Sequence, residues 1–168
     1  MIKGFIFILL GLFFTGCASS QPQGALFANH PQFDTTKALV YIYRKGNESG
    51  GYDRIYGLKA NNKDITILKH GGYFPYVVEQ GKIEFVADLI MTPVLIGMPL
   101  FTAIENASDN GAAKQELTVE AGKIYYLQFY PIEHFTYYEL RFKLNDGMTG
   151  LNDLKECKLL EAYNSTQK

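Results

Sequence analysis

The cysteine nearest the start of the chain, Cys17, has a setting that points to covalent chemistry. A positive charge at Lys3 precedes an uncharged, almost wholly apolar run from Gly4 to Phe14, and two small residues separate this run from the cysteine. Charge, apolar core and small residues in this order are typical of a secretory signal. A transmembrane helix needs roughly 20 apolar residues, and this run is shorter. We therefore expect residues 1–16 to be a signal peptide that is removed before Cys17.

The residues around Cys17 resemble a bacterial lipobox, in which the cysteine is acylated on its sulfur and, after cleavage, on its new amine. Thr15 and Gly16 fit the motif, while Phe14 stands where the common pattern has leucine. Two lipid signals suffice for stable anchoring, since each buried methylene contributes about 0.8 kcal/mol. The resemblance implies a lipid bilayer as partner. Ala18 rather than aspartate follows the cysteine, which by the same resemblance favours the outer membrane, on the side facing the periplasm.

Other residues that could do chemistry are scattered along the chain. The histidines are His30, His70 and His134, and none stands at a metal-ligand spacing from another or from Cys157. We expect them to be surface or loop histidines. Cys157 has helical spacing with nearby leucines, which is typical of a small core residue. The sequence has no Gly-x-Ser-x-Gly motif, phosphate-binding glycine loop or dinucleotide fingerprint. We expect no metal, no cofactor and no catalytic residue.

Arg44 has two open roles. It ends an apolar strand next to a loop rich in glycine. It pins that loop through carbonyls or a carboxylate, which we favour, or it holds an anionic ligand. The alternative to a non-enzymatic protein is an envelope enzyme with an unfamiliar site near Arg44, Asp53 and His70.

Four tyrosines, Tyr52, Tyr56, Tyr73 and Tyr76, flank the same region. If exposed, they form a stacking platform for a sugar or peptide, with Arg44 as a further contact. If buried, they belong to the core and the sheet faces, which we favour.

The uncharged stretch from Leu89 to Ile104 also allows two interpretations. It is too short, and too interrupted by proline, to cross a bilayer. The favoured interpretation is a plug at one end of the core. The other is an exposed apolar docking lip for a membrane or partner, formed by Leu95, Ile96 and Phe101.

Alternating apolar residues predict around eight short strands at hairpin spacing. The segments 38–44 and 123–129 are apolar on both faces, so we expect them to be central strands. Pro75 predicts a strand that is short, bulged or at an edge. The stretch 135–144 alternates with Tyr138, Leu140, Phe142 and Leu144 pointing inward. The pattern predicts a mainly β protein with an antiparallel β-sandwich.

One helix and three segments complete the expected organisation. Residues 152–162 predict a short C-terminal helix capped by Asn152, after a turn at Asp146–Gly147. Residues 17–36 read as a lipidated cysteine and flexible tether, with a bound segment using Leu26 and Phe27 as the alternative. The single domain spans 37–163 and the tail 164–168.

Composition limits the class of partner. The chain carries 16 basic and 17 acidic residues, for a formal net charge of −1. The basic residues are neither in excess nor clustered, so nucleic acid is not an expected partner. Once Cys17 is acylated only Cys157 is left, and no intrachain disulfide is expected.

Several segments together resemble a bacterial lipoprotein family known as domain of unknown function 2846. They are Leu39–Arg44, Gly72–Phe74, Gly81–Lys82 and Ala121–Leu127, and Gln80 departs from the proline usual before Gly81. The resemblance implies a lipid-anchored extracytoplasmic sandwich, transthyretin-like or related, of a kind used for carbohydrate or peptide surfaces. It brings no activity and no site residues. We expect a binding or scaffolding module of the cell envelope, whose partner is an envelope protein or a cell-wall component.

Overall fold

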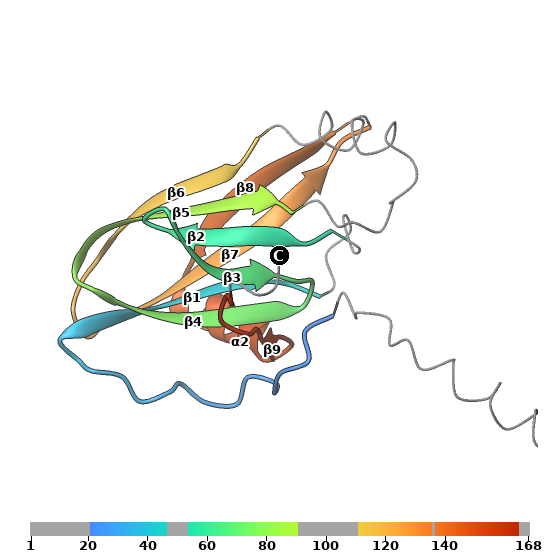
Figure 1. Ribbon diagram of the computed structural model, residues 1–168. Coiled ribbons are helices and arrows are strands. Elements are labelled where there is room, and N and C mark those ends of the chain that lie inside the picture. The colour runs from blue at the N-terminus through green and yellow to red at the C-terminus, as the bar shows by residue number, and fades with distance from the viewer. Residues whose placement is uncertain (1–20, 47–53, 91–110, 136, 165–168) are drawn as a thin grey trace, which may run out of the picture.

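The computed structural model describes residues 21–46, 54–90, 111–135 and 137–164, and within them it confirms the predicted β-sandwich (Figure 1). A five-stranded sheet has the order β8-β7-β1-β4-β9, and a four-stranded sheet has the order β3-β2-β5-β6. The elements are β1 (Lys37–Arg44), β2 (Tyr56–Ala60), β3 (Lys63–Leu68), β4 (Gly72–Glu79), β5 (Gly81–Leu89), β6 (Ala113–Val119), β7 (Ile124–Glu133), β8 (Tyr138–Asn145), α2 (Gly147–Leu154) and β9 (Lys158–Leu159).

The predicted central strands β1 and β7 do lie inside the five-stranded sheet. They pair with each other in parallel, as do β4 and β9, while the other strand pairs are antiparallel as expected. The ends of the strands therefore lie at two opposite ends of the sandwich. The Arg44 end, where Arg44 pairs with Gly72, carries the ends of β1, β3, β5 and β7. The opposite end carries the β4–β5 turn at Gln80, and we call it the Gln80 end.

Two apolar cores lie on the two faces of the five-stranded sheet, because successive side chains of a strand point to opposite faces. In β1, Val40 and Ile42 face the main core between the sheets. Leu39, Tyr41 and Tyr43 face a smaller outer core on the other side. Both faces of β1 are covered, which explains why both are apolar.

The outer core is covered by a segment that we expected to be a tether, and for residues 21–36 this expectation is wrong. Phe27 is 7% exposed and packs in the outer core. Its main-chain N–H donates to the carbonyl oxygen of Cys157 (3.1 Å), and the N–H of Leu159 donates to the carbonyl oxygen of Ala25 (2.8 Å). The structure has a bound segment, as in the alternative, but of its two named residues only Phe27 contributes a buried side chain, since Leu26 is 57% exposed and takes part through its bridge with Lys158. We call this pairing of residues 25–27 with 157–159 the latch.

The C-terminal helix begins and ends earlier than predicted. Asp146 is not part of a free turn but the N-cap of α2, since its carboxylate accepts from the main-chain N–H groups of Met148 and Thr149. The helix stops at Leu154, and Lys158 and Leu159 form β9 instead of continuing it. The capping pattern lies six residues before the predicted cap, where a following glycine made it look like a turn.

Two strand predictions are changed in detail. Leu140 and Phe142 pack against the main core as expected, but Leu144, in the edge strand β8, is 48% exposed. The strand with Pro75 is eight residues long rather than short. From Phe74 on, however, β4 lies at the edge of the sheet, as predicted, since β9 pairs only with Gly72 and Tyr73. A proline is tolerated there because no strand needs its missing N–H.

Candidate functional site

Arg44 has the structural role favoured by the sequence. Its side chain points into the Arg44 end of the main core and is 1% exposed. Its Nη1 donates to the carbonyl oxygen of Arg54 (2.6 Å), directly behind the glycine-rich loop, and its guanidinium lies 5.2 Å from the ring centre of Tyr56. Arg44 thus holds the far end of the loop through a carbonyl and does not present its charge to an external anion.

The alternative enzyme site loses support at two of its three residues. His70 lies in the β3–β4 connection, so it is a loop histidine as predicted, but it is only 4% exposed and not at the surface. It is buried because the short β3–β4 connection crosses between the two sheets. Arg44 is equally inaccessible. Asp53 lies outside the described residues.

The proposed tyrosine platform is not assembled. Tyr73 points outward and packs in the outer core, whereas Tyr76 points to the main core and meets Phe85 edge-on at 6.2 Å. Tyr56 is fully buried in the main core. The favoured interpretation, core and sheet-face residues, is confirmed for these three. Tyr52 lies outside the described residues.

Other expected sites also fall outside the described residues. These are the lipidation site Cys17 and the docking lip of Leu95, Ile96 and Phe101. The connection that carries the lip leaves β5 and enters β6 at the Arg44 end. Lipidation at Cys17 and the docking lip therefore remain predictions. Within the described residues, no helix is long and apolar enough to span a membrane.

An aromatic cluster fills the outer core under the N-terminal segment. Phe27 meets the rings of Tyr41 and Tyr73 edge-on, at 5.6 and 5.5 Å, and Tyr41 stacks on Tyr126 at 5.7 Å. His30 lies at the rim, with Nδ1 at 3.0 Å from the Tyr41 hydroxyl. Burial raises the pKa of Tyr41 and Tyr126, so both phenols stay protonated at neutral pH. The cluster fixes the segment to the sheet.

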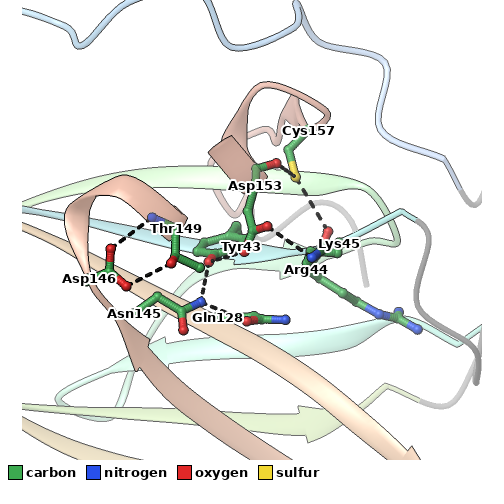
Figure 2. A network of polar contacts seen from close by, with 9 residues as sticks. All are labelled: Tyr43, Arg44, Lys45, Gln128, Asn145, Asp146, Thr149, Asp153 and Cys157. Atoms are coloured by element: carbon green, nitrogen blue, oxygen red, sulfur yellow. Dashed lines mark hydrogen bonds and ion pairs between the residues drawn. The ribbon is translucent and has the colours of Figure 1, made fainter. Parts of the chain in front are cut away.

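A polar network beside this cluster joins β1, β7, β8 and α2 (Figure 2). The Tyr43 hydroxyl donates to Asp153 Oδ2 (2.9 Å) and accepts from Asn145 Nδ2 (2.7 Å). Asn145 Nδ2 also donates to Gln128 Oε1 (2.8 Å). Asp153 Oδ1 pairs with Lys45 Nζ at 3.0 Å. We call these five residues the Tyr43 network.

The electrostatics of the Tyr43 network favour a structural role. Burial raises the pKa of Tyr43, an effect that the Asn145 hydrogen bond opposes and the neighbouring Asp153 reinforces. The phenol therefore stays protonated and serves as a donor to Asp153 rather than as a nucleophile. Both Asp153 oxygens are engaged inside the protein, so the network holds α2 to the sheet.

The buried thiol of Cys157 links the Tyr43 network to the latch. Cys157 is fully buried, which confirms a small core residue, although it lies after the helix rather than within it. Its Sγ lies 3.4 Å from the carbonyl oxygen of Asp153 and 3.8 Å from that of Arg44, while its own carbonyl accepts from Phe27. One residue thus contacts the strand end, the helix and the N-terminal segment.

Sequence reasoning missed this junction, yet one signal was present. A strand with two apolar faces, such as β1, needs a cover on each face. The four-stranded sheet covers one face. Phe27 and Phe33, with the helix residues Leu151 and Leu154, supply the other cover. Nothing local marked Asn145 and Gln128 as partners of Tyr43, because they lie far away in the sequence.

No metal centre emerges from the described ranges, since no three His, Cys, Asp or Glu side chains gather there in a way that could hold an ion. Comparison with protein-family models, with curated proteins and with solved structures finds no match for the chain.

Proposed function

We propose that this protein is a lipid-anchored module of the bacterial cell envelope that binds or scaffolds a partner and performs no catalysis. The latch is the observation that carries the proposal. The chain that leads from Cys17 is hydrogen-bonded into the fold at Ala25 and Phe27. An anchor tied so closely to a rigid sandwich suits a protein that displays a surface at a fixed place.

The chemistry of the polar groups supports a non-catalytic role. Arg44 donates to a main-chain carbonyl, and Asp153 is shared between Tyr43 and Lys45. These charged groups are engaged inside the protein, where they stabilise the Arg44 end and the docking of α2. A catalytic acid, base or nucleophile needs instead to reach a substrate.

The class of partner rests on two expectations from the sequence. The resemblance to the domain of unknown function 2846 family favours a carbohydrate or peptide surface, hence a cell-wall component or an envelope protein. Turnover of a cell-wall or lipid substrate by the purified protein would contradict the proposal.

The test of anchoring compares the full chain with Cys17→Ala, both expressed in a bacterium. We expect the wild-type protein to carry a lipid-sized mass gain on Cys17 and to sediment with membranes, and the variant to lose both. Cys157→Ala is the matched control, since it removes the other cysteine and should keep the lipid and the membrane association. An unmodified wild-type chain would refute the anchor.

A further inference from the structure

The latch fixes where the anchored end of the chain leaves the sandwich. Leu26 forms a bridge with Lys158, and Lys158 pairs with Gly72 at the Arg44 end. Pro22 is buried, and Gly24 lies directly against the main chain of Leu159. In Figure 1 the first described residues, in dark blue, lie beyond the start of β4, at the same end.

The short link to Cys17 limits how the domain can sit on a bilayer. Pro22 lies five positions after Cys17 in the sequence, and an extended chain over five residue steps spans at most about 18 Å. β1 runs its eight residues from the Gln80 end to the Arg44 end, which corresponds to about 26 Å. A cysteine held in the bilayer therefore cannot reach past the Gln80 end, so that end cannot face the membrane.

Among the strands that the structure describes at the Arg44 end, the β7–β8 hairpin extends well beyond the end of β1. Gln128 pairs with Tyr43 near the end of β1, and β7 continues to Glu133, about 17 Å farther. The length of the hairpin beyond β1 is similar to the greatest distance between Pro22 and Cys17. The hairpin tip and an acylated Cys17 can therefore both lie at the surface of one bilayer.

The hairpin tip carries an aromatic side chain with no cover. Phe135 is 104% exposed, the highest value among the large apolar side chains that the structure describes. Two flanking residues contact each other beneath it, since the N–H of His134 donates to the carbonyl oxygen of Tyr137 (2.9 Å) and the two rings stack at 4.4 Å. Aromatic residues are favoured at the boundary between headgroups and acyl chains.

We propose that the Arg44 end faces the bilayer and that Phe135 inserts into its headgroup region. The partner of this surface is the lipid that holds the anchor, so the inference rests on the proposed function. The Gln80 end, with its short turns, then points into the periplasm.

A single tryptophan tests this orientation, since the chain has none of its own. The acylated full-length variants Phe135→Trp and Met148→Trp are placed on vesicles of phosphatidylethanolamine and phosphatidylglycerol with brominated acyl chains. Met148 is the matched control, because it is 78% exposed and lies at the start of α2, just after Asn145, which pairs with Tyr126 in the middle of the sheet and far from the hairpin tip. We expect bromine to quench the fluorescence at position 135 and its emission to shift to the blue, with no change at position 148.

Flotation of the vesicles separates the two possible failures. Variants that do not float with the vesicles would refute the anchor itself. Variants that float with position 135 unquenched, or with both positions quenched alike, would overturn the orientation and leave the anchor intact. Both positions are exposed, so either tryptophan should leave the fold in place, as circular dichroism would check.

Discussion

Tyr43 holds three elements together through one hydroxyl group. Its ring packs in the outer core on β1, while its oxygen connects Asn145 at the end of β8 with Asp153 in α2. A buried hydroxyl with both a donor and an acceptor partner specifies one arrangement of these elements, because any other leaves polar groups unpaired.

Replacing Tyr43 by Phe should therefore destabilise the protein. The ring stays, but Asp153 loses a donor and Asn145 loses an acceptor, which should cost about 1–3 kcal/mol in the free energy of unfolding. Urea denaturation measures the loss. Tyr137→Phe is the control. Tyr137 is a half-buried tyrosine between β7 and β8, outside the Tyr43 network, so this change should alter the free energy of unfolding little. An equal effect of both changes would count against the network.

The cap of α2 should make stability depend on acid pH. Hydrogen bonds from the main chain and side chain of Thr149 lower the pKa of Asp146 below its usual 3.8. The charged carboxylate therefore stabilises the fold fully above 3.8, and this contribution is lost as the pH falls through the lowered pKa. Asp146→Asn cannot titrate, so the stability gap between wild type and variant should shrink below 3.8. A gap that is constant from neutral pH to acid would contradict the role of the charge.

At the scale of elements, close packing decides where α2 lies. A Cβ at Gly150 would overlap the ring of Tyr126, so the helix touches the outer aromatic residues with bare main chain. This contact explains a glycine in the middle of a helix, where it is otherwise unfavourable.

Gly150→Ala should destabilise the protein although alanine is the better helix former. The gain in helix propensity is about 1 kcal/mol, while forcing extra volume into a packed contact costs typically 1–3 kcal/mol. Gly147→Ala is the matched control in the same helix, since its Cβ would lie 3.9 Å from Tyr126, at ordinary contact distance. Thermal unfolding should show a lower midpoint for Gly150→Ala only. A rise in both midpoints would mean that α2 can shift away from Tyr126, and it would contradict a tightly packed contact at Gly150.

The strands could be predicted from the sequence, but the segments that pack on the outer face of the five-stranded sheet could not. Alternation is a local pattern, and it located β1, β7 and β8, although β7 runs four residues beyond its predicted end at 129 and β8 begins at Tyr138 rather than at 135. The helix was predicted too late in the sequence, because Asp146 followed by glycine is also typical of a turn. The contact between Gly150 and Tyr126 could not be predicted, because the two residues are far apart in the sequence. The N-terminal segment looked like a tether, because its partners at 157–159 lie at the other end of the sequence.

On the scale of the whole molecule, the latch ties the two ends of the domain together. The C-terminal residues after Cys157 pair with Gly72 and Tyr73 in one sheet, and Ala162 forms a bridge with Thr66 in the other. The same residues bind the N-terminal segment. This segment therefore closes one edge of the sandwich as well as the outer core.

The reactivity of Cys157 should report whether the latch is closed. In a Cys17→Ser background it is the only thiol, and it is fully buried. Phe27→Ala removes a buried ring at a cost of about 3 kcal/mol, so the thiol should react with a labelling reagent roughly a hundredfold faster in the native protein. Leu26→Ala is the control, because Leu26 is 57% exposed. Similar rates in both variants would mean that Phe27 does not hold the latch.

The latch also has a consequence for the order of events during biosynthesis. Ribosomes make the chain from its N-terminus, so Phe27 is finished long before its hydrogen-bond partner Cys157. Until the last residues of the domain follow, the segment behind Cys17 lacks its main-chain partners at residues 157–159. Under the proposed function, the enzymes that acylate Cys17 would meet this stretch before it docks. Its pairing with residues 157–159 would then follow only after the whole domain has been synthesised.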